Sequence, residues 1–324
     1  MLMSVLLFAV GLVLLIKGGD WFVDGATGIA KRFNLPDIVV GATVVSIGTT
    51  LPEVMVSTTG ALAGSGAMAY GNAIGSIICN TALIAAISIT CNPGPVNVKS
   101  MKTPAIFFFC SAAIYCIAAY ALGTFPRWLG FVMLTVFVVY MVLTVRNGLK
   151  NPDASDDEEE EEGKERKLWQ ELLLLVLGAA VIAVGADLLV EHGQIIAIGL
   201  GVPETVVALL FVALGTSLPE LVTTITSLKK GRASLGVGNV IGANVFNLVL
   251  VSGVAVSLAP FDVPVENELL NTGLNLSLVF DIPVMLLVMS LMIFPALAKK
   301  KLGRWQGILL LGIYAAFCVC QFVL

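Results

Sequence analysis

The chain has 324 residues, of which 58% are hydrophobic and 12% are charged. Soluble domains average roughly 45–50% apolar and about 25% charged residues, so the composition excludes a water-soluble enzyme and predicts an all-α protein that lies mostly in lipid. The formal net charge of −4 comes mainly from one acidic run, Asp153 to Glu162, which we interpret as a solvated loop between two apolar halves. Lipid is the expected partner of the surface, and we expect neither a nucleic-acid nor a protein partner.

Ten stretches are apolar and near the roughly 20 residues needed to cross a bilayer. They run at roughly 2–30, 36–62, 68–91, 103–122, 127–147, 168–196, 203–228, 234–258, 278–298 and 304–323. Lysine and arginine cluster in alternate connections, and such connections stay cytoplasmic, so both termini are expected outside. The short linker favours a prokaryotic host and its plasma membrane. The six cysteines lack paired metal-ligand spacing, and no cofactor is expected.

A single constant offset, the one that takes Pro36 to Pro203, aligns the two halves of the sequence without a gap. Pro36 to Glu53 (PDIVVGATVVSIGTTLPE) faces Pro203 to Glu220 (PETVVALLFVALGTSLPE), and the segment GNAIG at 71–75 faces GNVIG at 238–242. Each half holds five spans, an odd number, so the second copy must enter the membrane inverted, as in secondary transporters. We therefore predict two inverted five-helix repeats, 1–147 and 168–324, joined by an acidic cytoplasmic loop at 148–167.

The centre of each repeat is a proline-broken helix, the second and the seventh span. Pro52 and Pro219 have no N–H and clash with the preceding turn, which frees backbone carbonyls at membrane depth. Glu53 and Glu220 follow these prolines, and a carboxylate there is costly unless it meets a cation or water. Carboxylate, hydroxyl and carbonyl oxygens suit calcium or sodium rather than a soft metal. The sequence therefore predicts one cation site between the two breaks.

In these motifs the chain resembles the sodium/calcium exchanger branch of the cation/calcium exchanger superfamily. The resemblance rests on paired G-T-[ST]-L-P-E motifs, each followed some twenty residues later by G-N-x-I-G-[SA]-x-x-x-N. It implies an antiporter that exchanges sodium for calcium by alternating access, with spans one and six moving across the other eight. It also implies calcium ligands at Glu53, Glu220, Thr49 and Thr216, and sodium ligands at Ser46, Thr50, Ser76, Asn80, Ala213, Ser217 and Asn247. Pro52, Pro219, Asn72 and Asn239 are expected to support the site, the asparagines by pairing with freed carbonyls.

The second repeat departs from the family pattern, because Ala243 replaces the serine that matches Ser76. Both final motif positions, Asn80 and Asn247, are amides, where many relatives carry one aspartate. Two formal charges would balance one calcium ion, whereas three sodium ions would leave a net positive charge in a low-dielectric interior. The ion count and a dependence on potassium therefore stay open.

Three other functions use similar residues. A calcium/proton antiporter could titrate the same carboxylates, although the hydroxyls of Thr50 and Ser217 and the lack of an intramembrane histidine favour sodium. A channel is disfavoured because a doubly charged cage would hold calcium rather than pass it quickly. An intramembrane hydrolase would need a second-shell base or a metal triad that the sequence does not offer.

Overall fold

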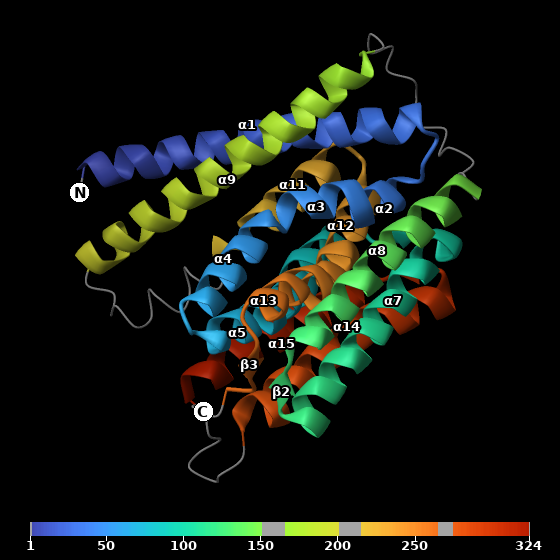
Figure 1. Cartoon of the computed structure of the whole chain (residues 1–324). Coiled ribbons are helices and arrows are strands. Elements are labelled where there is room, and N and C mark those ends of the chain that lie inside the picture. The colour runs from blue at the N-terminus through green and yellow to red at the C-terminus, as the bar shows by residue number, and fades with distance from the viewer. Residues whose placement is uncertain (1, 151–165, 201–214, 265–274, 324) are drawn as a thin grey trace.

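The computed structural model describes residues 2–150, 166–200, 215–264 and 275–323. Within these ranges the fold is helical apart from two short β-ladders (Figure 1). Seven helices are long and apolar enough to cross a membrane, or eight if the bent pair Asp37–Thr49 and Leu51–Leu62 is one span. The chain is therefore a multi-pass helical membrane protein.

The first half of the chain alternates α-helix with π-helical (η) segments. Its elements are α1 (Leu2–Arg32), α2 (Asp37–Val40), η1 (Gly41–Val45), α3 (Ser46–Thr49), α4 (Leu51–Leu62), α5 (Gly66–Cys79), η2 (Asn80–Ala85), α6 (Ala86–Cys91), β1 (Gly94–Pro95), α7 (Val98–Cys116), η3 (Ile117–Leu122), β2 (Thr124–Phe125) and α8 (Arg127–Lys150).

The second half repeats this order over its described residues up to β3, after which a π-helical segment precedes the long α-helix instead of following it. Its elements are α9 (Leu168–Gly199), α11 (Leu218–Lys229), α12 (Ala233–Phe246), η4 (Asn247–Val251), α13 (Ser252–Leu258), β3 (Phe261–Asp262), η6 (Ser277–Asp281), α14 (Ile282–Lys299), β4 (Lys301–Leu302) and α15 (Arg304–Val323). The predicted stretch 203–228 lies outside the described residues up to residue 214, and α11 forms its remainder.

The boundaries of the two halves match at two different offsets. The offset that takes Pro36 to Pro203 also takes α4 to α11, α5 to α12 and β1 to β3, at both ends of each element. The strands β2 and β4 and the starts of α8 and α15 instead share a larger offset, the one that takes Thr124 to Lys301. The prediction of one ungapped offset is therefore wrong beyond β3, because the chain from β3 to β4 is longer than the chain from β1 to β2.

Helices α1 and α9 form a closely packed antiparallel pair that lies across the other helices (Figure 1). A Cβ added at Gly11 would lie 2.9 Å from the carbonyl oxygen of Gly185, and one added at Gly185 would lie 2.9 Å from that of Gly11. Gly25 similarly faces the backbone of Glu171. Small residues let helix backbones approach closely in a membrane, where no hydrophobic effect drives helices together.

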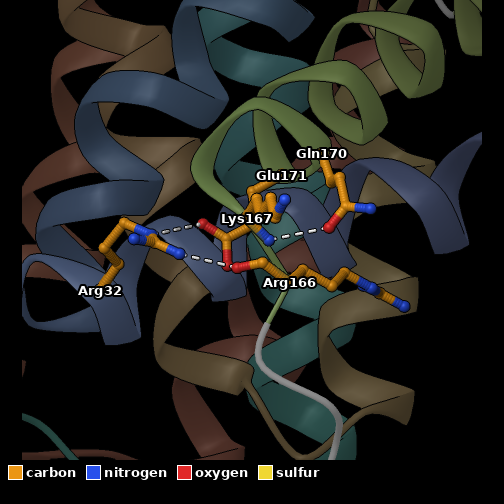
Figure 2. Close-up of polar contacts among 5 residues, drawn as sticks. All are labelled: Arg32, Arg166, Lys167, Gln170 and Glu171. Atoms are coloured by element: carbon orange, nitrogen blue, oxygen red, sulfur yellow. Dashed lines mark hydrogen bonds and ion pairs between the residues drawn. The ribbon is translucent and has the colours of Figure 1, made fainter.

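Polar contacts join the end of α1 to the start of α9 (Figure 2). Arg32 Nε lies 3.3 Å from Glu171 Oε2, and Arg32 Nη2 donates to the carbonyl of Arg166 at 2.7 Å. The Glu171 side chain is only 8% exposed, so Arg32 supplies the positive charge that this buried carboxylate needs. These contacts and the glycines make α1 and α9 one packing unit.

Helix α12 lies at the centre of the fold, and its residues from Leu235 to Phe246 are all buried. Two of its glycines, Gly238 and Gly242, face the broken helix of the first half. A Cβ added at Gly242 would lie 2.6 Å from Ala42 Cα, and one added at Gly41 would lie 2.8 Å from the Asn239 nitrogen. The polar side chains of α12 are thereby brought against η1 and α3, where the first proline break begins.

Candidate ion-binding site

The two broken helices have the same backbone conformation at their breaks. Thr50, between α3 and α4, has φ −86° and ψ −2°, and Ser217, before α11, has φ −89° and ψ 4°. Pro52 and Pro219 occupy the first turn of the helix that follows, where the missing N–H is tolerated. The axis bends by 46° at the first break. The sequence repeat thus produces two equivalent breaks, each followed by a glutamate.

Glu53 and Glu220 are completely buried and interact electrostatically with each other. Thr50 Oγ1 donates to Glu220 Oε1 at 3.5 Å. Among the described residues, neither oxygen of Glu53 and only one oxygen of Glu220 has a hydrogen-bond partner. Two adjacent buried carboxylates with unfilled acceptor positions are expensive in isolation, and a bound cation would compensate both.

Asn239 on α12 makes three side-chain hydrogen bonds, two to the first break and one to α11. Its Oδ1 accepts from Ser46 Oγ at 3.2 Å and from Thr49 Oγ1 at 3.1 Å. Its Nδ2 donates to Thr223 Oγ1 on α11 at 3.0 Å. Asn239 therefore links the helix that precedes Glu53 to the helix that carries Glu220.

Asn72 on α5 makes the corresponding contacts with the other break. Its Nδ2 donates to Ser57 Oγ at 2.8 Å and to the backbone carbonyl of Glu53 at 3.3 Å. Its Oδ1 accepts from Thr216 Oγ1 at 3.5 Å, which mirrors the contact between Asn239 and Thr49. The two asparagines thus hold the two threonines from opposite repeats.

Asn80 and Asn247 each begin a π-helical segment, η2 and η4. Both are fully buried, and none of their side-chain nitrogen and oxygen atoms has a hydrogen-bond partner among the described residues. The segments cross between repeats, since η2 contacts α11 and η4 contacts α4. Unpaired amides at a π-helical irregularity are unusual in a core and are typical of a binding site.

The structure describes most, but not all, of the remaining predicted ligands. Ser76 is buried on α5, Ser217 is buried at the second break, and Thr216 is half-buried beside it. Ala213 lies outside the described residues. Ala243, which stands where the first repeat has Ser76, is buried on α12 and contributes no side-chain oxygen.

The site offers oxygen ligands and little else. No group of three or more His, Cys, Asp or Glu side chains is close enough to hold a metal within the described ranges. The polar groups that converge are two carboxylates, hydroxyls and carboxamides, which match the hard cations calcium and sodium. A soft transition metal would lack its preferred ligands.

Comparison with known proteins identifies the family. The family model described as "Sodium/calcium exchanger protein" matches residues 3–146 and 171–323, which is most of the chain. The chain belongs to the sodium/calcium exchanger protein family. It is 30% identical to the sodium/calcium exchanger MaX1 of Methanosarcina acetivorans, with 98% of each chain covered. It is 33% identical to the uncharacterized membrane protein MJ0091 of Methanocaldococcus jannaschii, over 95% of this chain and 94% of the relative.

Solved structures of an exchanger share the fold. The sodium-calcium exchanger NCX_Mj, soaked with sodium and strontium, matches with a TM-score of 0.78 and 31% identity, covering 98% of each chain. The same protein soaked with sodium and no calcium matches with a TM-score of 0.79. The family resemblance stated from the sequence motifs is thereby confirmed.

In this member of the exchanger family, α1 and α9 cover the two breaks. A cavity of about 10 Å³, enough for about one water molecule, lies between these two helices and the breaks. Its lining combines Gly48, Thr49, Pro52 and Pro219 from the breaks with Phe22 of α1 and Ala179, Ile182 and Ala183 of α9. Movement of this exchanger's α1–α9 unit would therefore change access to the breaks.

The sequence motifs do not reveal every polar group that orders this site. Ser57 and Thr223 each receive the amide hydrogen of an asparagine, and Thr223 also donates to the Pro219 carbonyl at 2.8 Å. Ser57 lies four residues after Glu53, and Thr223 lies three residues after Glu220. Each hydroxyl therefore lies about one helical turn beyond the glutamate of its own helix. That spacing is the only sequence signal for them, because these two positions do not match each other at the offset that aligns the repeats.

Proposed function

We propose that this chain exchanges sodium for calcium across the membrane by alternating access. The observation that carries the proposal is the pair Glu53 and Glu220, buried at matching helix breaks with unfilled oxygen acceptors. Both ions would use the same two carboxylates, so binding of one excludes the other. An empty site would leave two buried charges uncompensated, which disfavours movement without an ion.

The proposed calcium ligands are the carboxylates of Glu53 and Glu220 and the backbone carbonyls of Thr49 and Thr216. The proposed sodium ligands lie around them, at Ser46, Thr50, Ser76, Asn80, Ala213, Ser217 and Asn247. Pro52 and Pro219 would keep the carbonyls free, while Asn72 and Asn239 would hold the threonines in place. The side-chain contacts of the two asparagines support this division of roles.

The proposed architecture is ten transmembrane helices in two inverted repeats, 1–147 and 168–324, joined by the cytoplasmic loop 148–167. The matched boundaries of α4 with α11 and of α5 with α12 support this arrangement. The alternating lysine and arginine connections support external termini. We place the protein in the plasma membrane, with α1 and α9 moving as one unit over the remaining helices.

Calcium uptake into proteoliposomes tests the exchange. Uptake should follow an outward sodium gradient and should be lost in Glu53→Gln and in Glu220→Gln. Asp281→Asn provides a matched control, because Asp281 is a part-buried carboxylate whose partner Gln321, at 2.6 Å, lies outside the proposed site. Uptake driven by a proton gradient without sodium would overturn the proposal in favour of calcium/proton exchange. Addition of potassium to the same vesicles tests its involvement.

A further inference from the structure

Two equivalent β-ladders connect the halves of the fold. Strand β1 pairs with β4, and β2 pairs with β3, both antiparallel. The helix formed by α7 and η3 starts after β1 and ends before β2, and its 25 residues span about 37 Å at the helical rise. The two ladders therefore lie at opposite ends of a membrane-length helix, near the two surfaces of the bilayer.

The turns that enter β2 and β4 have the same backbone conformation. Gly123 and Lys300, each of which directly precedes its strand, both have positive φ, at 68° and 53°. Each turn leads into a helix that begins with Arg-Trp, at Arg127 and Arg304, and each arginine donates to a carbonyl at the end of a neighbouring helix. The turns before β2 and β4 therefore share the same backbone structure.

The two turns differ in charge. Positions 299–301 are three lysines, whereas the equivalent positions 122–124 are Leu-Gly-Thr. Lysine is uncommon in the left-handed region, which glycine adopts without steric cost. The backbone of the turn thus favours glycine at position 300, as at position 123, and a requirement for positive charge would explain the lysine.

The three lysines line an open recess together with Arg304 and Trp305. The recess has a volume of about 1140 Å³, and Pro93, Gly94 and Pro95 form its other wall. No lysine of the three forms an ion pair within the described part of the chain. Segments 91–102 and 299–305 contain no acidic residue. Lys299 Nζ lies 5.3 Å from the ring centre of the exposed Trp305, so a cation–π contact joins two residues that line the recess.

We propose that this recess binds the phosphate group of an anionic phospholipid. It lies where α14 ends and α15 begins, so its cations are at the depth of the lipid headgroups. Basic pockets at the ends of membrane helices attract anionic headgroups, and an interfacial tryptophan packs against the start of the acyl chains. The lysine-free turn at the other ladder would not select such a lipid.

The test compares lipid binding by the purified full chain and by three variants, using native mass spectrometry and thermal unfolding. The probes are phosphatidylglycerol, phosphatidylcholine and free glycerol phosphate. Lys300→Gly should keep or raise the unfolding temperature in detergent, because glycine fits the positive φ. The same variant should bind phosphatidylglycerol about fivefold more weakly, and the triple variant Lys299→Gln, Lys300→Gly, Lys301→Gln should bind on the order of 100-fold more weakly.

Lys31→Gln is the control, because it removes one exposed charge from the end of α1. Its affinity for phosphatidylglycerol should stay within about twofold of the unsubstituted chain. Equal affinity of the triple variant and the unsubstituted chain would overturn the proposal. So would an equal loss in Lys31→Gln, equal binding of phosphatidylcholine, or binding of glycerol phosphate as tight as that of the lipid. None of these measurements depends on ion exchange, so the lipid site can fail while the proposed transport activity holds.

Discussion

Substitution of Asn239 by alanine tests whether this residue positions the candidate ion site or only contributes to the packing of α12. Alanine removes the three side-chain hydrogen bonds to Ser46, Thr49 and Thr223. It retains the bond of 3.0 Å from Ser46 Oγ to the backbone carbonyl of residue 239. Thr49 would then lose the side-chain hydrogen bond that ties it to α12.

The expected magnitudes follow from these contacts. Side-chain hydrogen bonds between membrane helices average about 0.6 kcal/mol, so the loss of three lowers the free energy of unfolding by about 2 kcal/mol. Groups that orient metal ligands typically contribute roughly 10- to 100-fold to metal affinity. We expect calcium affinity to fall by that factor, because the Thr49 carbonyl would no longer be held at the break.

Gln306→Ala is the matched control for this measurement. Gln306 is buried and also makes three hydrogen bonds, to the backbones of Leu291, Met292 and Gly303. Unfolding in detergent should show a similar loss of stability in both variants. Calorimetric titration with calcium should show weaker binding only in Asn239→Ala. Equal calcium affinities in the two variants would refute a positioning role for Asn239.

Three further substitutions test other parts of the fold. Ala243→Ser restores a hydroxyl in the second repeat and should strengthen sodium competition against bound calcium several-fold in an equilibrium binding assay, with calcium affinity itself unchanged. Lys230→Gln removes the 2.6 Å ion pair with Asp24 and the longer 3.8 Å contact with Asp20, which join the end of α11 to α1. A part-exposed pair contributes about 0.2–1 kcal/mol, so the labelling rate of a single engineered cysteine beside the breaks should change by at most about fivefold. Gly185→Leu should force α1 and α9 apart and lower thermal stability, while Gly312→Leu, which has open space around it, should not.

The sequence was sufficient to predict the helical class and the two proline breaks. Hydropathy identifies long apolar helices reliably because a bilayer demands both length and composition. The structure has helices at nine of the ten predicted stretches and over the described end of the other. The repeat also predicted the equivalence of Thr50 and Ser217, whose backbone angles agree within a few degrees.

Other features depend on tertiary contacts and could not be read from the motifs. The π-helical segments at Asn80 and Asn247 have no simple composition signal, since a π-helix is an adjustment of an α-helix to its surroundings. The change to a larger offset after β3 arises where the second half has the longer chain between its strands, and connections vary in length at little cost. The partners of Asn72 and Asn239 depend on which residues of adjacent helices face each other.

The two repeats share the proposed calcium ligands but only some of the proposed sodium ligands. Glutamate and threonine occur in both motifs, so each repeat would contribute one carboxylate and one carbonyl to calcium. The serines at positions 46 and 76 are matched by alanines 213 and 243, so both missing hydroxyls belong to the second repeat. Charge also limits the number of ions that the site can hold, because two carboxylates balance one calcium ion or two sodium ions. Any further sodium ion would have to rely on neutral oxygens, and these lie mainly on the first repeat. The number of sodium ions exchanged should therefore depend more on Ser46 and Ser76 than on their counterparts, Ala213 and Ala243.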